Sequence, residues 1–374
     1  MKKPFVFGKA VSDSNFIGRE EESERLRQNF SYGVNTILMS PRRWGKTSIV
    51  HRIGDEVKSG KLLVVYMDIF SCRDEYDFYN KFAEQILIQT ESRFEKWKEL
   101  ASDFIARLSP KINYSIDGGL NEYSVSLGIT PKSHKPEEVL QLPQIIAQKK
   151  NCDIVVCIDE FQQVGEFPDS LAAQKRMRGV WQLQENVSYC LYGSKKHMME
   201  AIFLKKTYPF YKFGEIIPLK LIPIEKWIPY IRKGFEMGNK QIMNEYITQI
   251  CKSTEYNPSY VQQYSWILFT NTKNAVDESS LKRSLQDLID ENSPLFIHQT
   301  ESLTTFQLNF IRAILNGIHT NFGSAEIREQ YHLGSYSNIN RIKKSLIDKE
   351  LIDDSTGEIH ISDPVLRMWL EQNI

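Results

Sequence analysis

Short apolar runs alternate with longer amphipathic segments along the first part of the chain. The runs are apolar nearly throughout, as strands are when both faces of a parallel sheet are covered. They occupy residues 36–39, 62–67, 153–158 and 187–193, and a last strand is expected at 215–221. Helical segments fall between the runs, at about 20–30, 46–58, 75–108, 136–150 and up to 185. Strands joined by helical crossovers predict an α/β core around a parallel sheet.

One part of this region breaks the pattern. Residues 112–116 and 123–127 alternate apolar and polar positions around Gly118-Gly119. This alternation about a glycine pair is typical of a hairpin, which we expect as an insertion on the sheet edge.

From Pro223 onward the periodicity is helical, at 225–235, 240–252, 259–271 and 279–290, which predicts a small helical lid. Three further helices at 304–315, 324–331 and 336–349 precede two short strands around Ser355-Thr356-Gly357, an order that resembles a winged helix. We therefore expect an α/β core over 1–222, a helical lid over 223–297 and a winged-helix domain over 298–374.

The connection between the first strand and the next helix carries a candidate phosphate-binding loop. Glycine lets the backbone close around an anion, and the amides at the helix start point at it. Lys46 would reach the β- and γ-phosphates, and Thr47 would bind Mg²⁺. Ser40 stands where the usual motif has its first glycine, and an ordinary turn is the alternative. The loop residues are Ser40, Pro41, Arg42, Arg43, Trp44, Gly45, Lys46, Thr47 and Ser48.

Two carboxylates follow the strand at 153–158, as in a Walker B element. Asp159 would hold Mg²⁺ at the carboxyl end of the strand, and Glu160 would polarise the attacking water. The alternative is a strand that ends in a solvated acidic turn. Ser194, at the tip of the strand at 187–193, is the candidate for sensing the γ-phosphate, unless it belongs to a plain Gly-Ser turn.

The composition indicates the cellular compartment of the protein rather than the reaction it carries out. The 374 residues carry no formal net charge, and the five scattered cysteines form no C-x-x-C pair, which favours reduced thiols over disulfides or zinc. The start is a poor signal peptide, and no apolar run reaches the roughly 20 residues of a membrane helix. We expect a cytoplasmic protein that does not contact membranes.

Nucleic acid is a weaker candidate partner. Residues 195–240 hold ten basic and four acidic side chains, which fits either a solvated face or a polyanion contact. A helix-turn-helix would place its third helix in a major groove, with Asn338, Asn340, Arg341, Lys343 and Lys344. However, from Glu301 onward seven basic side chains face ten acidic ones, so the module is poorly suited to neutralising phosphates.

Several of these motifs together resemble the archaeal-type ATPase family, a group of AAA+-like signal-transduction ATPases with numerous domains. The resemblance rests on Phe16-Ile17-Gly18-Arg19-Glu20 before the loop, Ile158-Asp159-Glu160-Phe161-Gln162, Gly193-Ser194 followed by Met198-Met199, and the ending from Ile361 to Leu370. It implies binding of ATP and Mg²⁺, with Phe16, Gly18 and Arg19 near the adenine. Family members often carry Gly-Arg before the last core strand. Here Tyr211-Lys212-Phe213-Gly214 stands there, and Lys212 would replace that arginine only in part.

The resemblance implies slow ATP hydrolysis that switches conformation and contacts with an unidentified protein partner or a second copy. A nucleotide-responsive DNA-binding regulator is the main alternative. A nucleotide-bound scaffold with little hydrolysis is the third hypothesis.

Overall fold

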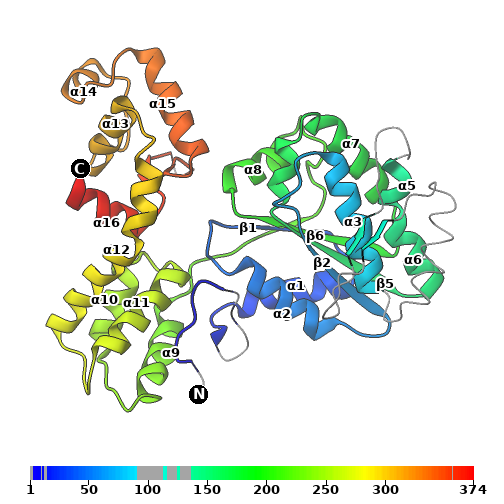
Figure 1. The fold of residues 1–374 in the computed structure, drawn as a ribbon, viewed down its shortest axis with the longest axis horizontal. Coiled ribbons are helices and arrows are strands. Elements are labelled where there is room, and N and C mark those ends of the chain that lie inside the picture. Colours follow the sequence, from blue (N-terminus) through cyan, green and yellow to red (C-terminus); the bar gives the residue numbers. More distant parts are fainter. Residues whose placement is uncertain are drawn as a thin grey trace. The chain divides into compact units, whose positions relative to one another are not determined.

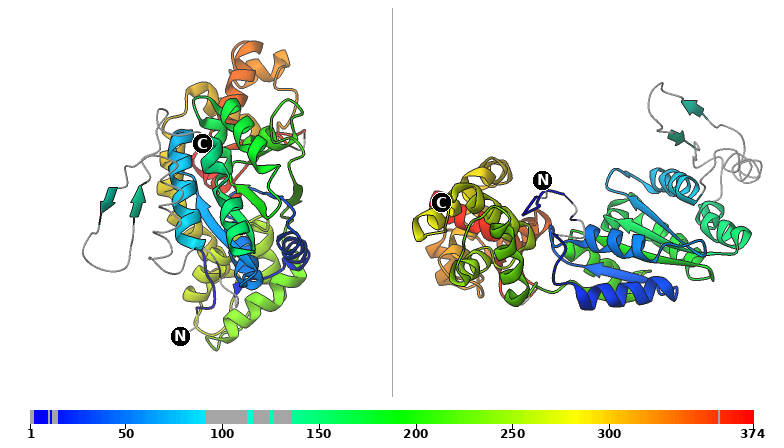
Figure 2. Two further views of the ribbon diagram at one scale, coloured as in Figure 1. Left: turned by 90° about the vertical axis from the view of Figure 1, so that its right-hand side faces the viewer. Right: turned by 90° about the horizontal axis from the view of Figure 1, so that it is seen from below.

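The computed structural model describes residues 3–9, 11, 15–90, 136–355 and 357–374 with their side chains, and 113–115 and 124–126 by their backbone. The chain divides into two compact units. One spans Ala10–Lys220, and the other combines Met1–Lys9 with Leu221–Ile374. Figures 1 and 2 colour the chain in sequence order, so the first unit runs from blue to green, while the dark blue start of the chain belongs to the other unit.

A five-stranded parallel sheet forms the centre of the first unit, as the apolar runs predict. Its order is β2-β5-β6-β1-β7, so β1 lies between β6 and β7. The register sets Met39 beside Gly193 and Asp68 beside Asp159, which brings the carboxyl ends of the strands to one edge. The last strand is shorter than expected, because it ends at Pro218. The strands are β1 (Thr36–Met39), β2 (Leu62–Asp68), β5 (Asp153–Asp159), β6 (Val187–Gly193) and β7 (Glu215–Pro218).

Helices cover both faces of this sheet. On one face, Leu38 of β1 joins apolar side chains of α1 (Glu20–Ser31) and α2 (Lys46–Val57). On the other, Ile37 and Met39 join the larger cluster. This alternation follows the two-residue period of a strand. The larger cluster is built on α3 (Glu75–Thr90), α5 (Pro136–Leu140), α6 (Leu142–Lys150), η2 (Phe161–Glu166), α7 (Ser170–Trp181) and α8 (Lys196–Leu204).

The expected hairpin is present, with one correction. Strands β3 (Asn113–Ser115) and β4 (Ser124–Ser126) pair antiparallel, with Tyr114 opposite Val125. They form a two-stranded sheet of their own and do not extend the edge of the main sheet. An antiparallel pair forms its hydrogen bonds between its own two strands, so it can form without joining the main sheet. The glycine pair of the turn, and the expected helix beyond Thr90, lie outside the described residues.

The second unit is helical until the two short strands near its end. Helix α12 is the main departure from expectation, since it continues ten residues past the predicted end and crosses the expected boundary at 297. The elements are α9 (Ile224–Glu236), α10 (Asn244–Ser253), α11 (Pro258–Asn271), α12 (Glu278–Thr300), α13 (Thr305–Leu315), α14 (Ala325–Gln330), α15 (Tyr336–Asp348), β8 (Ile352–Asp353), β9 (His360–Ile361) and α16 (Pro364–Asn373).

The end of α12 and the last helix hold this unit together. Trp369 of α16 donates a hydrogen bond from Nε1 to Ser293 Oγ at 2.9 Å. Tyr260 of α11 donates from its hydroxyl to Asp363 Oδ2 at 2.5 Å, and Asp363 also caps α16 through the amides of Val365 and Leu366. The same unit contains the start of the chain, where Phe5 is buried against aromatic rings of α9 and α11.

All five cysteines are buried and free. None of the helices within the described residues has both the length and the apolar character needed to cross a bilayer.

Candidate active site at the carboxyl edge of the sheet

The loop between β1 and α2 makes a tight turn that only glycine fits at one position. Gly45 has a φ of 89° and stands directly before the first residue of α2. A Cβ there would meet nothing within 4 Å, so the backbone angle and not space requires the glycine. The amides of the first turn of α2 have no acceptor within the helix and point out of its amino end. This end of α2 is built to receive an anion.

Lys46 is folded back over the loop. Its Nζ lies 2.8 Å from the carbonyl oxygen of Ser40, 2.8 Å from that of Pro41 and 3.4 Å from Ser40 Oγ. Lys46 and Ser40 are both buried. The serine that replaces the usual first glycine is therefore accommodated, with its hydroxyl close to the ammonium group. Arg42 and Arg43 are exposed on the outer side of the loop, and Arg43 also has a positive φ of 65°.

Thr47 and Asp159 meet directly. Thr47 Oγ1 donates a hydrogen bond to Asp159 Oδ2 at 2.8 Å, and the other carboxylate oxygen accepts the Glu160 amide at 2.8 Å. Burial raises the pKa of Asp159 to about 6, against the effect of these two hydrogen bonds. The two residues that the sequence predicts as Mg²⁺ ligands thus lie side by side at the end of β1 and β5.

Glu160 and Ser194 also meet. Ser194 Oγ donates to Glu160 Oε2 at 2.9 Å, and the same oxygen accepts a hydrogen bond from Gln162 Nε2. Glu160 holds this position with a φ of 55°, at the tight turn that ends β5.

Sequence reasoning gave Gln162 no role. Its side chain is buried, and its Oε1 has no hydrogen-bond partner among the described residues. A Cβ on Gly193 would lie 1.9 Å from that oxygen, so the glycine of β6 makes room for the amide. A buried orphan acceptor beside the carboxylate marks Gln162 as part of the site. A signal was present in the sequence: a glutamine two residues after the acidic pair, and a glycine directly before Ser194.

The segment before α1 reaches the loop through Arg19. Arg19 is 4% exposed, and its Nη2 donates to the Trp44 carbonyl at 3.1 Å. Gly18 has a positive φ of 63°, and the Phe16 ring lies under the Arg52 guanidinium at 4.5 Å. Phe16, Gly18 and Arg19 therefore gather against the loop and α2, while their contact with adenine stays a prediction. Ser48 of α2 accepts a hydrogen bond from the Val11 amide at 3.0 Å.

Lys212 lies away from this site. It precedes Phe213 and Gly214, which contact Asn35 directly before β1. Lys212 is therefore at the amino edge of the sheet, and the four residues of β1, about 13 Å of strand, separate that edge from the phosphate loop. The expectation that Lys212 partly replaces the family's arginine is not supported within one copy of the chain.

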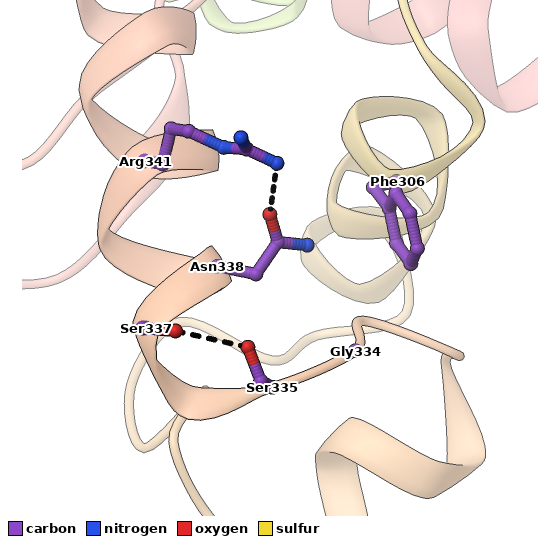
Figure 3. A pocket seen from close by; sticks show the side chains of 6 residues that line it. All are labelled: Phe306, Gly334, Ser335, Ser337, Asn338 and Arg341. Carbon is purple, nitrogen blue, oxygen red and sulfur yellow. Dashed lines mark hydrogen bonds between the residues drawn. The ribbon is translucent and has the colours of Figure 1, made fainter.

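The second unit carries a separate polar surface on α15. Figure 3 shows Arg341 donating from Nη2 to Asn338 Oδ1 at 2.8 Å, in a pocket of about 440 Å³ beside Phe306. Asn340 and Lys344 are exposed on the same helix, whereas Lys343 pairs with Asp354 of the wing at 2.8 Å. The predicted third helix thus exposes polar and basic side chains, and one of its lysines is neutralised.

Comparison with solved structures places this arrangement among known folds. A Walker-type ATPase of Pyrococcus abyssi matches with a TM-score of 0.70 at 16% identity, over 98% of this chain and 99% of that one. The ORC2 protein of Aeropyrum pernix, in ADPNP-ADP complexes, matches with a TM-score of 0.58 at 14% identity, over 96% of each chain. The ORC1 protein of the same organism, in complex with DNA, matches with a TM-score of 0.51 at 11% identity, over 96% and 94%.

Sequence comparison adds one domain. The family model described as "Probable winged helix domain" matches residues 294–372, which confirms the winged helix expected there. A search among curated proteins finds no match. The chain therefore has the fold of the Walker-type ATPase and of the ORC proteins, an α/β core of the P-loop type followed by helices and a winged helix domain.

Proposed function

We propose that the protein binds ATP with Mg²⁺ at the carboxyl edge of the sheet, hydrolyses it slowly to ADP and phosphate, and changes its contacts with a partner according to the bound nucleotide. The observation that carries the proposal is the meeting of two pairs at one edge. Thr47 bonds to Asp159, and Ser194 bonds to Glu160. Neither an ordinary turn nor a solvated acidic strand end would explain why both hydrogen-bonded pairs form at the same edge.

The residues present fit a magnesium ion. A hydroxyl and a carboxylate within 2.8 Å of each other are oxygens of the kind that Mg²⁺ prefers. Asp159 is half-buried, and burial raises the pKa of its carboxyl, so a cation beside it would stabilise the charged form. Thr47 and Asp159 would hold the ion, which when bound would neutralise charge on the β- and γ-phosphates.

The loop residues would bind the triphosphate. Lys46 now shares its ammonium protons with two loop carbonyls, and turning toward a phosphate would exchange these for stronger charge-assisted hydrogen bonds. The amides of Gly45 and of the first turn of α2 would donate to the same phosphates, with the positive end of the helix dipole behind them.

Glu160 is the candidate base for the attacking water, and two hydrogen bonds fix the direction of its carboxylate. Oε2 is already occupied by Ser194 and Gln162. In this proposal Ser194 and Gln162 are positioning residues.

Two variants test the proposal. Lys46→Ala should lose ATP binding by calorimetry, whereas Glu160→Gln should bind ATP and release little phosphate. Equal ATP affinity in wild type and Lys46→Ala would contradict the nucleotide site. Phosphate release by Glu160→Gln at the wild-type rate would remove Glu160 as the base, and negligible phosphate release by the wild type would favour a nucleotide-bound scaffold. Size-exclusion chromatography of Glu160→Gln with ATP and with ADP tests whether the partner is a second copy.

DNA binding is the second candidate function, favoured by the exposed Asn340, Arg341 and Lys344 on α15. The ion pair of Lys343 with Asp354, and the acidic wing around it, oppose a strong phosphate contact. A gel-shift titration of duplex DNA across salt concentrations separates the two. A steep loss of affinity with salt supports DNA binding, and no shift at low salt removes it.

A further inference from the structure

The chain passes between its two compact units at two places, after Lys9 and after Lys220. In both places the backbone on the ATPase side is hydrogen-bonded to the phosphate loop or to the helix that follows it. The connection near Lys9 is a single hydrogen bond, which the Val11 amide donates to Ser48 Oγ at 3.0 Å. The second runs through the side chain of Arg19.

Arg19 joins two backbone carbonyls that lie far apart in the sequence. Nη2 donates to Trp44 O at 3.1 Å, and Nη1 donates to Lys220 O and to Glu22 Oε1. Glu22 Oε1 in turn accepts the Lys220 amide at 3.2 Å. Arg19 and Glu22 therefore hold both the C=O and the N–H of the last residue before the second crossing.

The hydrogen bond from Arg19 to the Trp44 carbonyl also affects the orientation of the neighbouring Gly45 N–H. Trp44 C=O and Gly45 N–H belong to one planar trans peptide, so they point in opposite directions. A guanidinium that fixes the carbonyl on one side therefore fixes the Gly45 N–H on the other. Gly45, with its φ of 89°, can turn this peptide at little cost unless something holds it.

Burial makes this attachment rigid. Arg19 is 4% exposed, and burial lowers the pKa of its guanidinium while Glu22 raises it. An arginine stays charged at neutral pH and its planar fork fixes several donors at once, whereas a lysine offers a single charged centre. Each of the two carbonyls thus receives a charge-assisted hydrogen bond from one buried group.

We propose that Arg19, oriented by Glu22, is a positioning residue that holds the Gly45 N–H toward the bound phosphates and ties this peptide to Lys220, so that nucleotide binding changes the backbone where the chain leaves the ATPase unit. The inference rests on the proposed nucleotide site. It gives Arg19 a role different from the adenine contact that the family resemblance implies. The loop and the crossing act as one unit because a single side chain bonds to both.

The test uses the full chain and three variants. Arg19→Lys keeps the charge and replaces the planar fork of donors with a single ammonium centre, and Glu22→Gln keeps an acceptor oxygen and loses the charge. Arg27→Ala is the matched control, since Arg27 lies on the same helix and pairs with Glu24 and Glu56 on the exposed surface. Calorimetry gives the ATP affinity, circular dichroism confirms folding, and amide hydrogen exchange follows peptides over 40–48 and 219–224 with and without Mg-ATP.

In wild type, saturating Mg-ATP should slow exchange in both peptides together. Arg19→Lys should bind ATP about tenfold more weakly, the loss of roughly one charge-assisted hydrogen bond. Its peptide over 219–224 should no longer respond, even when the site is saturated. Glu22→Gln should show a smaller effect in the same direction, and Arg27→Ala should behave as wild type.

The outcomes separate the two proposals. If wild type binds no ATP, the proposed function fails and the inference fails with it. If wild type binds ATP and folded Arg19→Lys keeps both the wild-type affinity and the exchange response over 219–224, the inference alone is overturned. A response lost equally in Arg27→Ala would also overturn it, because general loosening of α1 would then be the cause.

Discussion

The hydroxyl of Ser194 donates a hydrogen bond to Oε2 of Glu160 at 2.9 Å, across the ends of two neighbouring strands. The pair lies at the carboxyl edge of the sheet, where Thr47 also bonds to Asp159. A carboxylate held in this way has a fixed direction, and a fixed direction is what a base for a bound water needs.

Replacing Ser194 by alanine should therefore slow hydrolysis without weakening ATP binding. We expect kcat to fall about ten- to a hundredfold, less than the roughly 10²–10⁴-fold of a general base because Glu160 itself remains. The ATP dissociation constant should stay within about twofold of wild type. Phosphate release and calorimetry measure the two quantities. Ser188→Ala, a buried serine on the same strand, is the control and should leave both unchanged. A parallel loss of affinity in Ser194→Ala would point to a structural role instead.

Gly193 and Gln162 should be energetically coupled. A Cβ at Gly193 would fall 1.9 Å from Gln162 Oε1, so Gly193→Ala should destabilise the protein by about 1–3 kcal/mol in denaturant unfolding. Removing the clash with Gln162→Ala in the same chain should restore part of this stability. A double-mutant cycle with additive effects would contradict the close approach.

The raised pKa of Asp159 predicts a pH-dependent stability in the metal-free protein. Burial raises this pKa from 3.8 to about 6, so between these values the folded state binds more protons than the unfolded chain. The contribution of Asp159 to stability is then full below pH about 4 and falls as pH rises toward 6. The stability of Asp159→Asn minus that of wild type should grow across this window and then level off. Unfolding in a chelator checks this, with Asp153→Asn at the exposed start of β5 as control. A difference that does not vary with pH would contradict it.

Tyr260 should stabilise the packing of α11 against the end of the chain. Its hydroxyl bonds to Asp363 Oδ2 at 2.5 Å, and Tyr260→Phe leaves that carboxylate oxygen without this donor. We expect a loss of about 1–3 kcal/mol, as for hydrogen bonds to charged groups. Tyr246→Phe, on the neighbouring helix α10 and half-buried, should change stability little. Equal unfolding midpoints for the two variants would show that the hydrogen bond contributes nothing net.

The sequence predicts the sheet and the loop well because their signals are local. An apolar run followed by Gly-Lys-Thr, or by Asp-Glu, predicts a strand and also places the polar residues at the carboxyl edge of the sheet. Thr47 bonds to Asp159 there, as this reasoning requires. Arg19 is different. Its partners at Trp44 and Lys220 are backbone carbonyls 25 and 201 residues away, and no side-chain pattern marks a backbone acceptor.

Two other features were hidden for similar reasons. Gln162 can be assigned to the site only once the structure shows that Gly193 of β6 lies beside its side chain. Helix α12 continues past its expected end through Pro294, where Ser293 and Phe296 pack against Trp369 of the last helix. Contacts from the end of the chain, rather than local periodicity, account for its length.

Helix α12 runs without a break into the winged helix domain, so a tilt of this helix at one end would be transmitted to the other. Its 23 residues span about 35 Å at 1.5 Å per residue, and a tilt of about ten degrees at one end displaces the other by about 6 Å. The hydrogen bonds of Ser293 and Asp363 clamp the last helix to this unit, so the winged helix should travel with α10 and α11. A spectroscopic label on α10 and another on α15 should therefore keep a constant separation with and without Mg-ATP.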